Sequence, residues 1–354
     1  MGIRRLCYVL AIQLLAAQIA WAQVEVGEKN SIGSVAPLFQ DQAPLTLQLR
    51  FSLKDLKENT NDSTYITSTL VFQNKESSWD SLKIKLRARG NLRRKICYYA
   101  PLKVKLKKKA TQGTVFEGTT KLKLVLPCML ENDNDDLVVK EYMAYKLYEL
   151  ISPYHYKTRL ANIEFEEEKR SRTKTHQLKA ILLEDIDRVA QRHHGQVMTR
   201  KVHPLQQDDL SSIQCSFFEY LIGNTDYSTK GEHNQKLVYI DKKYVSIPYD
   251  FDMSGLVNAS YAGVSGMENI KGSITSVTQR AYKGYTRDEV LLQEVRQKCI
   301  SKKNEMFRVM DSLKEYFQSP SLFEEAQDFV TDFFEIMESD EKFKKYIVDR
   351  TRAK

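Results

Sequence analysis

Hydrophobic and polar residues alternate along much of the first half of the chain, beginning at Leu45. A period of two residues is typical of strands with one buried face, because successive side chains point to opposite sides of a strand. Val, Ile, Thr and Phe are frequent in these stretches, which favours strands further. The pattern predicts strands at LTLQLRF (45–51), TYITSTLVF (64–72), SLKIKLRARG (81–90), APLKVKLK (100–107), TKLKLVLP (120–127), TRLANIEFE (158–166) and QLKAILLE (177–184).

Helical spacing of apolar residues takes over in other stretches. It predicts helices at 135–151 and 210–222, and mostly amphipathic helix over 287–350 with a break at Ser319-Pro320. Two short strands, KLVYI and YVSIP, flank the turn Asp241-Lys242-Lys243, and a Gly- and Ser-dotted loop covers 253–280.

This distribution predicts a strand-rich lobe at 45–190 and a helix-rich lobe at 191–354 that carries an acidic site. The chain has 354 residues, which is enough to bury the core of one large domain or of two lobes. We therefore expect an α+β fold with two lobes.

The first residues have the features of a secretory signal peptide at 1–22. Arg4 and Arg5 precede an apolar run of about fifteen residues, which ends at Ala20-Trp21-Ala22. The run contains two Gln residues and is too short to favour a stable membrane anchor. We expect cleavage, a flexible leader at 23–44, and a mature protein that is periplasmic, at the cell surface or secreted, without a transmembrane anchor.

Four cysteines remain after the predicted signal peptide: Cys97, Cys128, Cys215 and Cys299. Export would permit disulfides, but the sequence cannot choose among the three full pairings, and buried free thiols are an equal alternative. No CxxC spacing occurs, so a zinc ribbon or a thioredoxin-like site is not expected.

A strongly basic segment lies at residues 83–109, which contain twelve Lys or Arg and no Asp or Glu. Alternation places Lys103, Lys105 and Lys107 on one face of a strand, opposite a second strand with four cations. Such a face would attract phosphate oxygens, although a solvated strand face is the simpler alternative. Few aromatic residues are interleaved, so nucleic acid is not the expected partner.

Acidic residues and an asparagine gather at 223–255. Asp226 follows a predicted helix, Asn234 comes eight residues later, and Asp250 and Asp252 follow the second short strand. Phosphoryl transfer requires one carboxylate near the attacking hydroxyl, and an Asn and an Asp that hold a divalent metal. Hard oxygen ligands of this kind suit Mg²⁺ or Mn²⁺.

The order of these motifs resembles the CotH-type atypical kinases, a family named from a spore-coat protein. The resemblance covers about residues 80–256 and depends on Arg87-Ala88-Arg89-Gly90-Asn91, Leu102-Lys103-Val104-Lys105-Leu106, Leu122-Lys123-Leu124-Val125-Leu126, Ile181-Leu182-Leu183-Glu184-Asp185-Ile186-Asp187, Asp226 with Asn234, and Pro248-Tyr249-Asp250-Phe251-Asp252.

The resemblance implies a two-lobed atypical protein-kinase-like fold and transfer of phosphate from ATP to a protein hydroxyl. It implies that Asp226 is the catalytic base. Asn234 and Asp250 would hold Mg²⁺ or Mn²⁺, with Asp252 assisting.

It also implies a nucleotide site. Arg89, Gly90 and Asn91 would lie over the phosphates, and Lys105, or Lys103 on the same face, would contact them. Glu141 would pair with that lysine, and Glu184 would reach the linker between the lobes.

Two other functions stay open. The first is a non-catalytic envelope or surface protein that binds a partner or an anionic ligand. The second is a metal-dependent phosphodiesterase that uses Asp226, Asp250 and Asp252.

Overall fold

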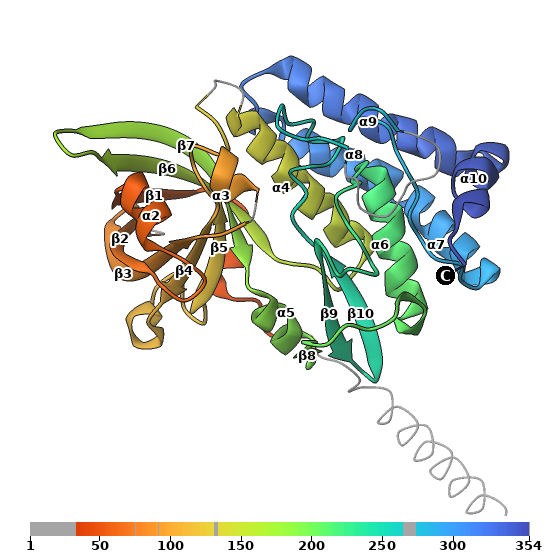
Figure 1. Ribbon diagram of the computed structural model, residues 1–354, viewed down its shortest axis with the longest axis horizontal. Coiled ribbons are helices and arrows are strands. Elements are labelled where there is room, and N and C mark those ends of the chain that lie inside the picture. The colour runs from red at the N-terminus through yellow and green to blue at the C-terminus, as the bar shows by residue number, and fades with distance from the viewer. Residues whose placement is uncertain (1–32, 75, 91, 131–133, 265–273, 354) are drawn as a thin grey trace, which may run out of the picture. The chain divides into compact units, whose positions relative to one another are not determined.

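Seven strands of the first half of the chain close into a barrel (Figure 1). They are β1 (Leu45–Phe51), β2 (Ile66–Gln73), β3 (Trp79–Ala88), β4 (Leu102–Leu106), β5 (Lys121–Val125), β6 (Thr158–Glu168) and β7 (Thr173–Glu184). Their order around the barrel is β1-β2-β3-β4-β5-β7-β6. All neighbours are antiparallel except β1 and β6, which run parallel from Leu45↔Ala161 to Phe51↔Glu167 and close the barrel.

The strand alternation predicted from the sequence fills the barrel with aliphatic and aromatic side chains. Leu82, Ile84, Leu86 and Ala88 of β3 are all buried, and the Lys and Arg residues between them point outward. Phe72 and Phe116 meet edge to face in the same core, with ring centroids 5.0 Å apart. Burial of this apolar surface is the main stabilising contribution to the barrel.

The structure, a computed structural model, describes residues 33–74, 76–90, 92–130, 134–264 and 274–353. Val35–Lys354 forms one compact unit. The predicted signal peptide lies outside the described residues, as does the first part of the predicted leader, residues 23–32. The end of that leader is packed, because Leu38 and Phe39 are buried in the barrel core and Asp41 accepts a hydrogen bond from Arg159 at 2.7 Å.

Helices and a small sheet make up the rest of the unit. The helices are α2 (Leu53–Asn59), α3 (Arg93–Ile96), α4 (Asn134–Ile151), α5 (Ile186–Arg192), α6 (Asp209–Leu221), α7 (Glu289–Ser301), α8 (Lys303–Ser312), α9 (Pro320–Glu338) and α10 (Asp340–Tyr346). Strands β8 (Gln196–Val197), β9 (Gln235–Ile240) and β10 (Lys243–Pro248) form the sheet in the order β10-β9-β8.

Helices α4 to α10 share a second core, which also includes one face of the β9–β10 hairpin, whereas α2 packs on the barrel core. Helix α4 contacts α6, α8 and α9 as well as the barrel strands β6 and β7, so it joins the barrel to the helices (Figure 1). Asp208 caps α6, and its carboxylate accepts a hydrogen bond from the backbone N–H of Ser211 at 2.9 Å. Pro320 begins α9, where the sequence predicted a break.

The prediction of a two-lobed atypical protein-kinase-like fold, with a strand-rich and a helix-rich lobe, is wrong. The strands form a closed seven-stranded mixed barrel, and the helices are added to it. The cause is the pairing of β1 with β6, since strands so far apart in the sequence leave no local signal of their pairing.

Two of the four cysteines form a disulfide, and the other two are free. Cys97 and Cys128 are bridged between the end of α3 and the segment after β5, 31 positions apart. Cys215 and Cys299 are free and buried. Among the described residues, no helix is long and apolar enough to cross a membrane.

Candidate functional site

Asp226 lies in the connection between α6 and β9. Helix α6 ends at Leu221, and Gly223 adopts a left-handed backbone with φ +62°. A Cβ at Gly223 would also come within 2.8 Å of the Phe329 ring, so only glycine fits this turn. The side-chain oxygen of Asn224 then accepts a hydrogen bond from the backbone N–H of Asp226 at 2.9 Å. This turn fixes the position of Asp226 just after the end of α6.

Asn234 holds Asp226 through its side-chain amide. Its Nδ2 group donates to the backbone carbonyl of Asp226 at 2.8 Å and to the carboxylate Oδ2 at 3.1 Å. Backbone hydrogen bonds in both directions between Ser228 and His233 close the intervening loop. The predicted partners are therefore adjacent in space, although eight positions separate them.

His233 is a further neighbour of Asp226. Its Nε2 lies 3.5 Å from Asp226 Oδ2, and about a quarter of the Asp226 side chain is exposed. The hydrogen bond to Asp226 raises the pKa of His233. A protonated His233 would form an ion pair with the same carboxylate oxygen that accepts a hydrogen bond from Asn234.

The end of β10 brings Asp250 to the same place. The backbone N–H of Tyr249 donates to the carbonyl of Asn234 at 3.0 Å, which joins the two segments. The backbone N–H of Asp250 donates to the hydroxyl of Tyr145 at 3.0 Å. Asn234 and Asp250 both have positive φ, at +52° and +69°. Non-glycine residues in this region of backbone space often occur at functional sites.

Arg89 brings positive charge to the site from the end of β3. Its guanidinium lies 3.6 Å from Asp250 Oδ2, and its backbone N–H donates to the carbonyl of Pro101 at 2.8 Å. Gly90 turns the chain after it with φ +82°. Asn91 lies outside the described residues, so its predicted role stays a prediction.

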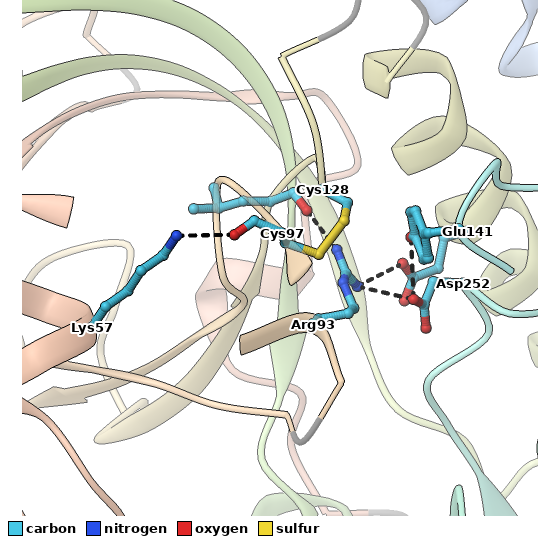
Figure 2. Close-up of a disulfide and its surroundings, with 8 residues drawn as sticks. Lys57, Arg93, Cys97, Cys128, Glu141 and Asp252 are labelled. Carbon is cyan, nitrogen blue, oxygen red and sulfur yellow. Dashed lines mark hydrogen bonds and ion pairs between the residues drawn. A yellow bond between two sulfur atoms is a disulfide. The ribbon is translucent and has the colours of Figure 1, made fainter. Parts of the chain in front are cut away.

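Arg93 on α3 faces two buried acids. Its Nη1 lies 3.7 Å from Glu141 on α4 and 3.6 Å from Asp252, as Figure 2 shows. Its Nη2 donates to the carbonyl of Leu126 at 2.7 Å. Nη1 of Arg93 and Oε1 of Glu141 are buried without a hydrogen-bond partner. One guanidinium therefore faces two acids, and the hydrogen bonding of this group is incomplete.

The disulfide fixes the segment that carries Arg93. Cys97 follows α3 directly, and the bond to Cys128 ties the helix to the residues after β5 (Figure 2). The backbone N–H of Tyr98 donates to the carbonyl of Cys128 at 2.8 Å. Nζ of Lys57 donates to the carbonyl of Cys97 at 3.0 Å. These bonds fix the backbone of the α3 segment, and the Arg93 guanidinium therefore lies against Glu141 and Asp252.

Burial and charge move the pKa values of the three acids in different directions. Burial raises the pKa of Glu141, and Asp252 adds to this effect. Burial also raises the pKa of Asp252, which accepts a hydrogen bond from the Tyr261 hydroxyl at 3.2 Å. For Asp250, burial acts in the same direction, but its cationic neighbours, Arg89 foremost, outweigh it and lower the pKa. Asp250 is thus the acid of this group that favours the charged state.

The predicted phosphate-contacting lysines lie on β4, and a third lysine lies nearer the acids. Lys103 is directly opposite Lys123 on β5. Nζ of Lys123 lies 4.3 Å from the centre of the Tyr249 ring. Burial and then Arg89 lower the pKa of Lys123 to about 7. Lys105 lies one cross-strand row further along, with Nζ 4.2 Å from the centre of the Tyr65 ring.

Glu184 is engaged elsewhere. It is buried, accepts a hydrogen bond from Arg192 at 3.0 Å, and accepts another from the backbone N–H of Lys157 at 3.0 Å. These contacts account for its charge and describe a structural ion pair between β7 and α5. Glu141 pairs with Arg93 and not with a β4 lysine.

Lys283 stabilises the backbone on both sides of Asp226. Its side chain is buried, and Nζ donates to the carbonyl of Thr225 at 3.0 Å and to the carbonyl of Tyr227. The two acceptors flank Asp226. The backbone of Lys283 is held in turn, because its carbonyl accepts a hydrogen bond from Arg352.

The acids and Asn234 offer the oxygen donors that Mg²⁺ or Mn²⁺ would use. Because the Asn234 amide nitrogen faces Asp226, its carbonyl oxygen is directed away from that residue. Within the described ranges, no group of three or more His, Cys, Asp or Glu side chains is arranged to hold a metal. Mg²⁺ commonly takes only one or two protein carboxylates and completes its shell with substrate phosphates and water. Asp250 and Asn234 fit that kind of site.

Arg93, Lys123, His233 and Lys283 were missed from the sequence. His233 and Lys123 lie next to or within quoted motifs, and that proximity was the available signal. Lys283 follows a loop and had no local signal. Neither the family models nor the curated protein sequences compared with this chain contain a match.

Proposed function

We propose that this protein transfers a phosphoryl group from a nucleoside triphosphate to a hydroxyl of a protein, with a divalent metal. The observation that carries the proposal is the pairing of Asp226 with Asn234 beside Asp250, which in turn faces Arg89. This set supplies a carboxylate near solvent, oxygen donors for a cation and a counter-charge for phosphate. The proposal depends on this site and not on a kinase-like fold.

The proposed step assigns a role to each of these residues. The acceptor hydroxyl oxygen forms a bond to the terminal phosphorus, and its proton goes to the Asp226 carboxylate. The bond between that phosphorus and the bridging oxygen breaks, and the nucleoside diphosphate leaves with the electron pair. Asn234 orients Asp226, and Arg89 neutralises phosphate charge.

Asn234 and Asp250 would hold the metal, which when bound neutralises charge on the phosphate oxygens. Asp252 has a different place in the proposal, because Arg93 and Tyr261 already engage its carboxylate. We assign Asp252 to positioning the Arg93 segment.

Export remains part of the proposal. The Cys97–Cys128 disulfide supports an oxidising compartment, in which such bonds persist. In that setting nucleotide must reach the site outside the cytoplasm.

One observation favours the second candidate, a non-catalytic protein that binds an anionic ligand. Arg89 faces Asp250, and Arg93 faces Asp252 and Glu141, so much of the acidic charge is compensated before any cation binds. A site with such internal pairing would bind anions through its remaining cations.

The test compares chain 23–354 with the variants Asp226→Asn and Asp250→Asn. Each is incubated with ATP labelled at the γ-phosphate, Mn²⁺ and dephosphorylated casein, and nucleotide-dependent thermal shifts are recorded in parallel. We expect label transfer and a Mn²⁺-dependent thermal shift for the unchanged chain. Asp226→Asn should lose transfer but keep the shift, and Asp250→Asn should lose both. A shift without transfer in the unchanged chain favours the binding-only candidate.

A further inference from the structure

The outer face of β3, β4 and β5 is cationic over several rows of residues. Because Leu and Ile residues of these strands point into the barrel, the residues between them point outward. We call this surface the cationic barrel face. It consists of Lys83, Lys85, Arg87, Lys103, Lys105, Lys121 and Lys123.

The strand register aligns these cations in rows across the sheet. Arg87 is directly opposite Lys103, and Lys103 is directly opposite Lys123. The next row contains Lys85, Lys105 and Lys121 in the same order. Side chains in one row start about 5 Å apart, and successive rows are about 7 Å apart along the strands.

Placing like charges directly opposite one another destabilises a sheet. The row of Lys85, Lys105 and Lys121, and the neighbouring pair Arg87 and Lys103, therefore contain like charges that repel one another, and a bound anion would relieve this repulsion.

Few carboxylates relieve it within the protein. Arg87 pairs with Asp62 at 2.8 Å, and that aspartate side chain is 97% exposed. Lys121 pairs with Asp187 at 3.0 Å. Among the described residues, no carboxylate lies within ion-pair distance of Lys85, Lys103 or Lys105.

Tyrosine side chains hold several cations of this face in place. The Tyr65 hydroxyl accepts a hydrogen bond from Nε of Arg87 at 3.2 Å, and Lys105 lies over the Tyr65 ring. Burial would raise the pKa of Tyr65, but its bonds to Arg87 and Lys105 outweigh it and lower that pKa. At the other end of a row, Nζ of Lys123 lies 4.3 Å from the centre of the Tyr249 ring and 5.3 Å from the centre of the Tyr156 ring. Both anchors restrict cations that would otherwise spread into solvent.

We propose that the cationic barrel face binds a ligand with three or more phosphate groups in a chain, which lies across the rows of β3, β4 and β5. Two rows of cations match successive phosphates, because each phosphate is within reach of cations from neighbouring strands. The row that ends at Lys123 is next to Arg89 and Asp250, so one end of the ligand would lie at the candidate functional site.

Two sources share this chemistry. One is the triphosphate of a nucleotide, which would connect the face to the proposed function, and the other is inorganic polyphosphate. The binding itself does not depend on phosphoryl transfer. Nucleic acid is a different partner, and it is less favoured because the Tyr65 ring is covered by Lys105 and so offers no open ring for base stacking.

The test measures binding by isothermal titration calorimetry at fixed ionic strength without metal. The titrants are orthophosphate, tripolyphosphate, ATP and a single-stranded DNA of matched charge. The protein is chain 23–354, the double variant Lys103→Ala/Lys105→Ala, and the control Lys174→Ala/Lys298→Ala. The control removes two exposed lysines, on β7 and α7.

We expect tripolyphosphate to bind at least tenfold more tightly than orthophosphate. The β4 double variant should lose at least tenfold in tripolyphosphate affinity, while the control stays within twofold of the unchanged chain. If ATP depends on the β4 lysines to the same degree, the nucleotide is a source of the phosphate chain. If only tripolyphosphate does, the source is inorganic polyphosphate.

Three results would overturn the proposal. One is equal affinity for orthophosphate and tripolyphosphate. Another is an equal loss in the control, which would indicate non-specific attraction. The third is tighter binding of the DNA than of tripolyphosphate. If transfer from ATP is absent but tripolyphosphate binds as described, the proposed function fails and this inference stands.

Discussion

The ammonium of Lys283 donates a hydrogen bond to the carbonyl oxygen of Thr225 at 3.0 Å, and Thr225 directly precedes Asp226, the candidate catalytic residue. The same group also reaches the carbonyl of Tyr227, so the residues on both sides of Asp226 depend on one buried side chain. The position of Asp226 is therefore set by a residue 57 positions later in the chain (283 − 226).

Replacement of Lys283 by Met should loosen this loop. The change leaves two buried carbonyls without a donor, which costs on the order of 2 kcal/mol in the free energy of unfolding. Hydrogen exchange should become faster at residues 224–231 and stay unchanged in α9. Lys283→Arg, which keeps a donor, should recover part of the protection. Uniformly faster exchange across all helices would contradict a local role.

Loss of Arg93 should destabilise the protein strongly. Arg93→Met leaves Glu141 and Asp252 buried without their counter-charge, and breaking a buried ion pair in this way costs about 3 to 5 kcal/mol. In urea unfolding, the double variant Arg93→Met/Glu141→Gln should recover part of that loss. Arg94→Met is the control, because Arg94 bonds the Thr60 carbonyl and neither acid. Equal losses of stability in Arg93→Met and Arg94→Met would show that the unpaired acids are not the cause.

The disulfide should contribute about 3.5 kcal/mol to stability, by the chain-entropy estimate for a loop of this length. Cys97→Ala/Cys128→Ala should lower the free energy of unfolding by an amount of that order. Thiol titration of the denatured chain 23–354 should find two reactive thiols, those of Cys215 and Cys299. Four thiols without reductant would contradict the assignment of the bridge.

Two buried histidines, His155 and His193, should each destabilise the folded state as the pH drops below about 6.5. Burial lowers the pKa of His155 to about 4, and burial and then Arg192 lower that of His193 to about 4. At these two histidines the unfolded chain binds protons that the folded chain does not between the ordinary histidine pKa and pH 4, so their contribution disfavours the folded state across that window. The loss should be on the order of 2 to 3 kcal/mol per histidine.

Urea unfolding at pH 7.0 and 5.0 checks this expectation. In His155→Gln, the free energy of unfolding at pH 5.0 should be higher, relative to its value at pH 7.0, than it is in the unchanged chain. His203→Asn, a change at an exposed histidine, should leave the difference between the two pH values as it is. The idea fails if both variants show the unchanged pH dependence.

Local patterns predicted the separate elements well. Alternation placed the strands near their observed positions, and the helices predicted at 135–151 and 210–222 are α4 and α6 within one residue at each end. The short hairpin before Asp250 is also confirmed. These features depend on neighbours a few residues apart, which a sequence displays directly.

Features that depend on distant residues could not be predicted. The closure of β1 on β6 joins two strands whose own patterns are ordinary, and it turns a predicted lobe into a barrel. The site divides in the same way. Asp226, Asn234, Asp250 and Arg89 belong to motifs that a sequence shows. Lys283 comes from a segment with no signal of its own, and Arg93 lies in the basic segment 83–109, where nothing indicated that it would face Glu141 and Asp252. Their contacts exist only in the folded chain.

The central claim is phosphoryl transfer at Asp226, and the position of a radioactive label tests it most directly. Chain 23–354 and Asp226→Asn are incubated with Mn²⁺ and ATP labelled at either the γ- or the α-phosphate, and protein-bound label is measured. The account predicts that γ-label enters protein hydroxyls, that α-label does not, and that Asp226→Asn lowers γ-labelling at least 100-fold. Equal γ-labelling by the unchanged chain and by Asp226→Asn would contradict it, as would no labelling above a protein-free control.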